Sequence, residues 1–160
     1  MTFDNSKFII RSRIRLFVAT VLFLAYLLLA FAANIIKFPL LSMDEATVTI
    51  ILTAVYLIIV FIPMALSYQY IYYSDEGDVV IFRYFYAGIV GGKKNSIEIH
   101  KSTFSGYTLE KKLLGLNQSI ILYQQIKGGK AKYPPIYISA LTKADKEKVF
   151  RSLNLLLHSR

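Results

Sequence analysis

The fold is decided by two uncharged stretches, residues 16–36 with the sequence LFVATVLFLAYLLLAFAANII and residues 46–73 with the sequence ATVTIILTAVYLIIVFIPMALSYQYIYY. A helix needs about 20 mostly apolar residues to cross the roughly 30 Å hydrocarbon core of a bilayer. Each stretch reaches that length without an Asp, Glu, Lys or Arg. We therefore predict two transmembrane helices, over residues 16–36 and 46–66.

The charges around these helices predict their orientation. The first helix follows a basic segment, residues 1–15, whereas the connector 37–45 carries a single lysine beside Asp44 and Glu45. Because Lys and Arg are enriched on the cytoplasmic side of membranes, we expect residues 1–15 and residues 67–160 in the cytoplasm and the short connector outside. The expected location is a bacterial cytoplasmic (inner) membrane, crossed twice. The basic residues of the first segment are Lys7, Arg11, Arg13 and Arg15.

A cleaved secretory signal is an alternative interpretation of the N-terminal part. A basic start, an apolar run and the small residues around Ala30 and Ala32 fit such a signal. The apolar run continues through Ile35 and Ile36, however, and is longer than the core of a typical signal peptide. An uncleaved helix is therefore favoured.

Residues that carry chemistry are sparse. The chain has no cysteine, and its two histidines, His100 and His158, have no further nitrogen or sulfur ligand close by in the sequence. No serine lies in a hydrolase elbow, and no glycine loop has the spacing of a phosphate-binding loop. We predict no catalytic residue, no metal and no cofactor, and a protein that is not an enzyme. The net charge of +9 comes without an arginine-rich arm, so no nucleic acid partner is expected.

The second half of the chain reads as a succession of short strands. Alternating or β-branched runs are separated by turn residues, among them the acidic turn 74–78 and the glycines Gly88, Gly91 and Gly92. Lys127-Gly128-Gly129-Lys130 predicts a tight hairpin, and Pro134-Pro135 predicts that the last strand begins at an edge or a bulge. The first expected strand ends at Tyr73, and the later ones cover residues 79–86, 96–100, 104–109, 120–126 and 133–139.

A helical period replaces the strand pattern after Leu141. Thr142 and Asp145 have the spacing of an N-terminal cap, and an apolar face follows. A curled sheet needs a cover, so this face is expected to pack on the strands, although an amphipathic helix is also able to bind a membrane surface. The residues of the apolar face are Val149, Phe150, Leu153, Leu156 and Leu157.

Several short strands closed by one amphipathic helix resemble the pleckstrin-homology (PH) superfold. The segments that carry the resemblance are residues 70–77, YIYYSDEG, residues 96–99, SIEI, and residues 136–142, IYISALT, which leads directly into the helix. Together with the preceding apolar helices, residues 67–160 resemble the bacterial PH-like domains that follow a transmembrane hairpin. The resemblance implies a membrane α+β protein with a small β-barrel or curled antiparallel sheet, and a non-catalytic binding role.

The charge of residues 67–160 suggests a contact with lipid. Fourteen Lys and Arg stand against seven Asp and Glu in this segment, a net charge of +7. Basic residues near an anionic leaflet contribute on the order of 1 kcal/mol each. The candidate anionic-lipid contacts are Lys93, Lys94, Lys101, Lys111 and Lys112. For any single one of these lysines, an ordinary solvated cytoplasmic surface is the favoured interpretation.

Three functions remain open from the sequence. The favoured one is an accessory or scaffolding subunit of an inner-membrane complex, with a membrane protein or a second copy of the chain as partner. The second is a sensor of anionic lipids or of phosphate-bearing ligands. The third is an oligomeric transporter lined by Thr20, Asn34 and Thr53, which is disfavoured because the predicted spans contain no ionisable side chain of the kind that ion transport uses.

Overall fold

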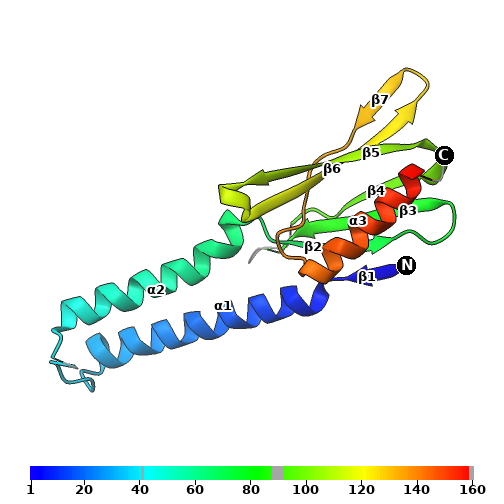
Figure 1. Cartoon of the computed structure of the whole chain (residues 1–160). Helices are drawn as coiled ribbons and strands as arrows, with labels where there is room; N and C mark the ends of the chain where they lie inside the picture. The colour runs from blue at the N-terminus through cyan, green and yellow to red at the C-terminus, as the bar shows by residue number, and fades with distance from the viewer. Residues whose placement is uncertain (41, 88–91, 159–160) are drawn as a thin grey trace. The chain divides into compact units, whose positions relative to one another are not determined.

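The computed structural model describes residues 1–40, 42–87 and 92–158 and divides the chain into two compact units (Figure 1). One unit combines Met1–Ile9 with Ala65–Arg160, and the other is Ile10–Met64. Two apolar helices and antiparallel sheets confirm the predicted α+β class. The turn glycines Gly88 and Gly91 lie outside the described residues.

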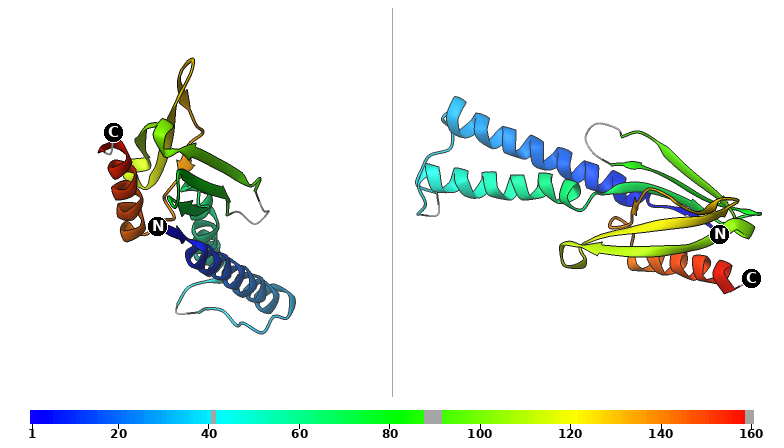
Figure 2. Two further views of the ribbon diagram at one scale, coloured as in Figure 1. Left: turned by 90° about the vertical axis from the view of Figure 1, so that its right-hand side faces the viewer. Right: turned by 90° about the horizontal axis from the view of Figure 1, so that it is seen from above.

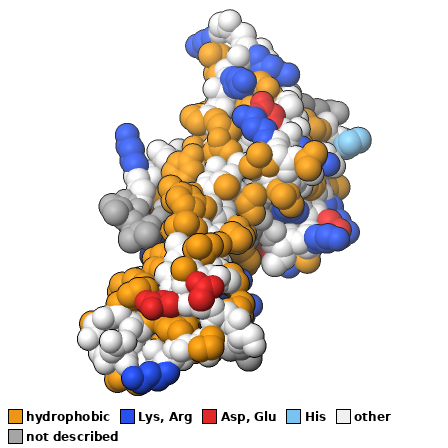
Figure 3. Space-filling view, turned by 90° about the vertical axis from the view of Figure 1, so that its left-hand side faces the viewer, with side chains coloured by type: hydrophobic (Ala, Val, Ile, Leu, Met, Phe, Trp, Pro, Cys, Tyr) orange, Lys and Arg blue, Asp and Glu red, His pale blue; other side chains and the backbone are white. Residues whose placement is uncertain are grey.

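The helices α1 (Ser6–Leu27) and α2 (Glu45–Ala65) account for the two apolar stretches. A short π-helical segment, Leu28–Ala32, continues α1, so that the first helix reaches 27 residues and the second 21. By length and composition, both are able to cross a membrane. Their apolar side chains are largely exposed, as the hydrophobic surface in Figure 3 shows. The first helix begins ten residues earlier than the span predicted from hydropathy.

The first sheet holds four antiparallel strands in the order β1 (Thr2–Asp4), β2 (Gln69–Ser74), β3 (Val79–Tyr86) and β4 (Asn95–His100). Strand β1 was not predicted, because three residues are too few to show a period. It pairs with β2 in the register Thr2 with Ser74 and Asp4 with Tyr72. The strand that precedes α1 therefore lies beside the strand that follows α2.

The second sheet is built around β6 (Asn117–Ile126). Strand β5 (Phe104–Lys112) pairs along one edge, and β7 (Gly129–Lys132) and β8 (Ile136–Tyr137) pair one after the other along the opposite edge. The prediction was a small β-barrel or a curled antiparallel sheet, and the barrel is not formed, since the described strands lie in two separate antiparallel sheets. The chain passes from β4 to β5 through the 3₁₀ turn Lys101–Thr103 (η2) and enters the second sheet instead of pairing back.

The prediction for the last strand, 133–139, is wrong in its limits. The tight hairpin predicted across Lys127–Lys130 is formed, but its turn has only two residues, and pairing starts at Gly129. The pairing is then interrupted before it resumes at Ile136. Pro134 and Pro135 lie in the interruption, because proline has no N–H to donate to a sheet.

Helix α3 (Lys143–His158) covers the strands, as Figure 2 shows for this unit. Its N-terminus is capped as predicted: the Asp145 amide donates to Thr142 Oγ1 at 3.1 Å, and the Thr142 hydroxyl donates to Asp145 Oδ2 at 2.7 Å. Val149 and Leu153 are buried in the core, whereas Leu157 stays partly exposed. The apolar face of α3 therefore packs within the domain. The core is completed by side chains from both sheets, including Ile71, Tyr73, Phe82, Ile99, Phe104, Ile120, Leu122 and Ile136.

Candidate functional site

Asn5 fastens the start of the chain to β2. Its side-chain amide donates to the Gln69 carbonyl at 2.9 Å, and its side-chain oxygen accepts from the Ile71 amide at 2.8 Å. The Asn5 backbone N–H donates to the Ile71 carbonyl at 3.2 Å. Asn5 is buried, and α1 begins at the next residue. The residues around Asn5 and Ala65, where the chain enters α1 and leaves α2, are called the proximal end of the domain below.

Asn117 makes a second fastening at the proximal end. Its side-chain amide donates to the carbonyl of Ala65, the last residue of α2, at 3.1 Å, and to Ser67 Oγ at 3.4 Å. Asn117 is the first residue of β6 and is itself buried. The turn between β5 and β6 is consequently held beside the point where the chain leaves α2.

Four of the five lysines predicted as lipid contacts lie at the proximal end. Lys93 and Lys94 directly precede β4, whose first residues pair with the end of β3. Lys111 and Lys112 end β5, opposite Asn117 and Gln118. All four are exposed. Lys112 also has a carboxylate nearby, with its Nζ 4.0 Å from Glu110 Oε2.

The fifth lysine, Lys101, lies elsewhere. It belongs to η2, and its backbone N–H donates to the Asp78 carbonyl at 2.9 Å, beside the β2–β3 turn. Strand β5 has nine residues, which places Lys101 roughly 30 Å from Lys112 at 3.3–3.4 Å per residue. The structure therefore does not bring Lys101 together with the other four.

Sequence reasoning missed the residues between Lys112 and Asn117. The 3₁₀ turn Leu113–Gly115 (η3) and the following Leu116 expose three leucine side chains at the proximal end, Leu113, Leu114 and Leu116. A turn between two strands normally carries polar residues, glycine or proline. The signal that would have found them is the sequence LLGL in that position, directly after two lysines.

The opposite, distal end of the domain holds a hydrogen-bonded network around Asp75. The Asp75 carboxylate accepts hydrogen bonds from the Ser152 hydroxyl on α3 and from the α-amino group of Met1. Tyr73 Oη lies 2.6 Å from Ser152 Oγ. Burial tends to raise the pKa of Asp75, but the hydrogen bonds from Met1 and Ser152 outweigh it and lower the pKa below the ordinary 3.8. This network connects β1, β2 and α3.

We expect Ser152→Ala to raise the pKa of Asp75, because the variant removes one donor that favours the carboxylate. A carboxyl group whose pKa is lower in the folded chain than in the unfolded chain stabilises the fold at a pH above its unfolded-state pKa. This stabilisation is lost as the pH falls through its folded-state pKa. The variant should therefore lose less stability than the native chain between neutral pH and pH below 3.8. Carboxyl titration by NMR measures the shift. The control is Ser139→Ala, because the Ser139 hydroxyl accepts a hydrogen bond from the Gln118 amide and does not contact Asp75. An unchanged Asp75 pKa in Ser152→Ala would contradict the expectation.

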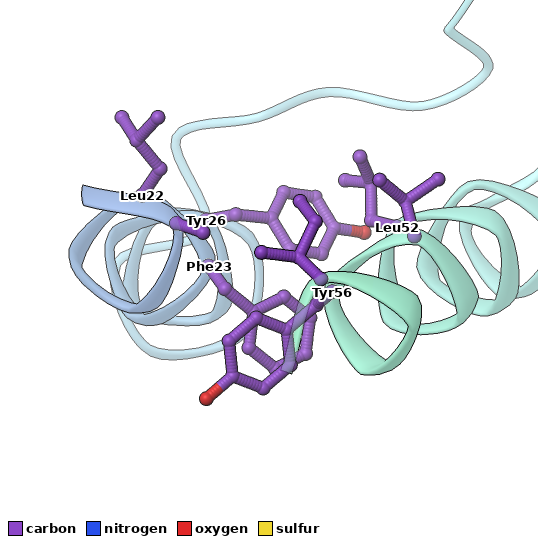
Figure 4. Close-up of a pocket in the computed structure, with 8 residues that line it drawn as sticks. Leu22, Phe23, Tyr26, Leu52 and Tyr56 are labelled. Carbon is purple, nitrogen blue, oxygen red and sulfur yellow. The ribbon is translucent and has the colours of Figure 1, made fainter. Parts of the chain in front are cut away.

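The helix pair encloses a groove of its own, shown in Figure 4. It has a volume of about 240 Å³ and is lined almost entirely by apolar side chains. Phe23 stacks on Tyr56 with ring centroids 4.5 Å apart, and the Tyr26 hydroxyl lies 2.6 Å from Thr49 Oγ1. Thr20 donates to the Leu16 carbonyl at 2.9 Å. These polar groups hydrogen-bond within the helix pair, which is ordinary helix packing.

The proximal end presents lysine ammonium groups beside exposed leucines, an arrangement suited to binding and not to catalysis. Within residues 1–40, 42–87 and 92–158, no three His, Asp or Glu side chains gather in a way that would hold a metal ion. Comparison with protein family models, with curated proteins and with solved structures finds no match for this chain.

Proposed function

We propose that this chain is a non-catalytic accessory or scaffolding subunit of a bacterial inner-membrane complex, which binds a partner protein through a cytoplasmic PH-like domain. The observation that carries the proposal is the pairing of β1 with β2. Because these strands precede α1 and follow α2, the domain is fastened to the chain at both helices. Two attachments hold a domain in a more constant position than a single flexible linker, which suits a subunit that presents one surface to a neighbour.

The same pairing supports a two-span topology. Strands that share hydrogen bonds lie on one side of a membrane, so the chain between them crosses an even number of times. Two crossings agree with the two apolar helices, and the basic residues on both flanks favour the cytoplasmic side for the domain. The pairing also supports retention of α1, because cleavage near Ala32 would remove β1 from the sheet.

Site-specific photo-crosslinking in native membranes tests the proposal. The exposed side chains of Ser96 and Glu98 lie on β4, the last strand in the order of the first sheet, and are replaced one at a time by a photo-reactive residue. Lys37, exposed in the connector, provides the control position. We expect crosslinks to a distinct protein from the domain positions, and co-elution of that protein in mild detergent. A lone monomer without crosslinks would contradict the proposal.

A second candidate function, recognition of anionic lipid, is favoured by the gathering of Lys93, Lys94, Lys111 and Lys112 at the proximal end. Lys7 lies there as well, since the neighbouring Phe8 packs on Tyr68 with ring centroids 5.4 Å apart. Ammonium groups near an anionic surface are attracted over about one Debye length, roughly 8–10 Å at physiological salt. The attraction is additive across lysines that face the same leaflet.

We expect replacement of Lys93, Lys94, Lys111 and Lys112 by glutamine to abolish the enrichment of anionic lipid that co-purifies with the chain. Each lysine near the surface contributes on the order of 1 kcal/mol, so the combined loss is well over tenfold in relative lipid affinity. Mass spectrometry of the co-purified lipids measures the change. The matched control replaces four lysines of the distal half, Lys101, Lys127, Lys130 and Lys132. Equal, salt-insensitive enrichment in both variants would reject lipid recognition.

A further inference from the structure

The turn between β5 and β6 exposes more apolar surface than a soluble turn normally does. The exposed fractions are 57% for Leu113, 105% for Leu114 and 65% for Leu116. Single exposed leucines are common on protein surfaces, but three within four residues form a contiguous patch that favours an apolar environment. The patch therefore needs a partner.

The backbone of the turn is arranged to present these side chains. Leu113 and Leu114 have φ angles of +50° and +55°, a region that leucine rarely adopts because Cβ crowds the following carbonyl. Gly115, at φ +88°, completes the reversal. The Leu116 N–H donates to the Leu113 carbonyl at 3.1 Å, and Gln118 Nε2 donates to the Gly115 carbonyl at 2.8 Å. An unusual conformation that is held by specific hydrogen bonds is a frequent mark of a functional segment.

The position of the turn identifies its partner. Asn117, the residue directly after Leu116, donates to the carbonyl of Ala65, where the apolar helix α2 ends. A chain that leaves a membrane span at this point holds the turn beside the bilayer surface. Lys111 and Lys112 directly precede the leucines, and ammonium groups next to apolar side chains match the phosphates and acyl chains of a lipid interface.

We propose that the Leu113–Leu116 turn inserts into the cytoplasmic leaflet as a third membrane contact. The leucines enter the boundary between headgroups and acyl chains, and Lys111 and Lys112 stay at the level of the phosphates. This inference rests on the proposed anchoring of the chain by α1 and α2. The two connections to α1 and α2 lie at one end of the domain and still allow the domain to rotate. The inserted turn is a third point of attachment, which would prevent this rotation.

Tryptophan fluorescence of the full chain in lipid nanodiscs tests this insertion, because the natural chain contains no tryptophan. The variants L114W and L116W report on the turn, and Leu116 has an ordinary backbone at φ −71°, so at least one of the two should fold. The matched control is I126W, an apolar residue that is 49% exposed at the far end of β6. The variant L22W, in α1, reports separately on the anchor.

We expect L114W and L116W to emit at shorter wavelength than I126W, and to be quenched by lipids brominated on the acyl chain but not by aqueous acrylamide. Acrylamide should quench I126W. Quenching of the turn variants by acrylamide would overturn the insertion, as would shielding from both quenchers, which indicates a contact with protein. In either case, bromolipid quenching of L22W shows that the anchor itself holds. If L22W escapes bromolipid, the anchoring fails and the insertion with it.

Discussion

Phe82→Ala should lower the free energy of unfolding of the domain by about 3–5 kcal/mol. The Phe82 side chain is fully buried on β3, where its ring lies 4.7 Å from that of Tyr73, and Ile97 faces it across the strand pair. Truncation removes the buried ring and leaves a cavity that two paired strands are unable to close. Urea unfolding of the full chain in mild detergent, followed by the near-ultraviolet circular dichroism of its tyrosines, measures the loss.

Phe85→Ala is the matched control for Phe82→Ala. Phe85 lies three residues along the same strand, on the opposite face, and stacks on Tyr70 at 4.8 Å between ring centroids while remaining partly exposed. Its truncation should cost about 1–2 kcal/mol, from the lost stacking and a smaller buried area. Equal losses in the free energy of unfolding for the two variants would contradict the finding that the Phe82 face of β3 is the one that packs in the core.

Asn5→Ala should lower the stability of the domain by about 2–4 kcal/mol, because it leaves the Ile71 N–H and the Gln69 carbonyl without their side-chain partners in a buried position. The three-residue strand β1 depends on this fastening, so we expect it to detach from β2. Hydrogen exchange at the amide of Phe3, which pairs with Tyr73 of β2, should then accelerate well beyond that of the β3 amides.

Asn154→Ala provides the comparison for Asn5→Ala. The Asn154 side chain is exposed on α3 and accepts one hydrogen bond, from the Tyr107 hydroxyl at 3.0 Å. Its removal should change stability by less than about 1 kcal/mol and leave β1 protected. If exchange at Phe3 is unchanged in Asn5→Ala, the strand is held by its backbone pairing alone, and the double fastening proposed for the domain loses its main support.

Much of the domain was predictable from local sequence. The strands around Ile71, Phe82 and Ile97 follow the alternation of a half-buried surface, and the paired glycines Gly128-Gly129 predicted a tight hairpin, which is formed. The cap at Thr142 was equally readable. These features depend on neighbours within a few residues, which is the range over which strand and helix periods act.

The candidate site was predictable only in part. Five lysines were selected from their loop positions, yet Lys101 lies at the distal end, because one strand separates it from Lys111 and Lys112. The leucine turn was not predicted as part of a site, because apolar residues in a sequence ordinarily indicate a core. Only the exposed fractions of the side chains distinguish Leu114 from a buried leucine such as Leu153.

By itself, the sequence determined two helices long and apolar enough for a bilayer, a strand-rich second half and a capped C-terminal helix, since composition and periodicity govern each of them locally. Tertiary structure alone decided that β1 joins β2, that Asn117 reaches Ala65, and that the strands stay in two sheets. The physical reason is chain separation. Asn5 and Gln69 are 64 residues apart, and no local pattern specifies which distant backbone group a buried amide will bind.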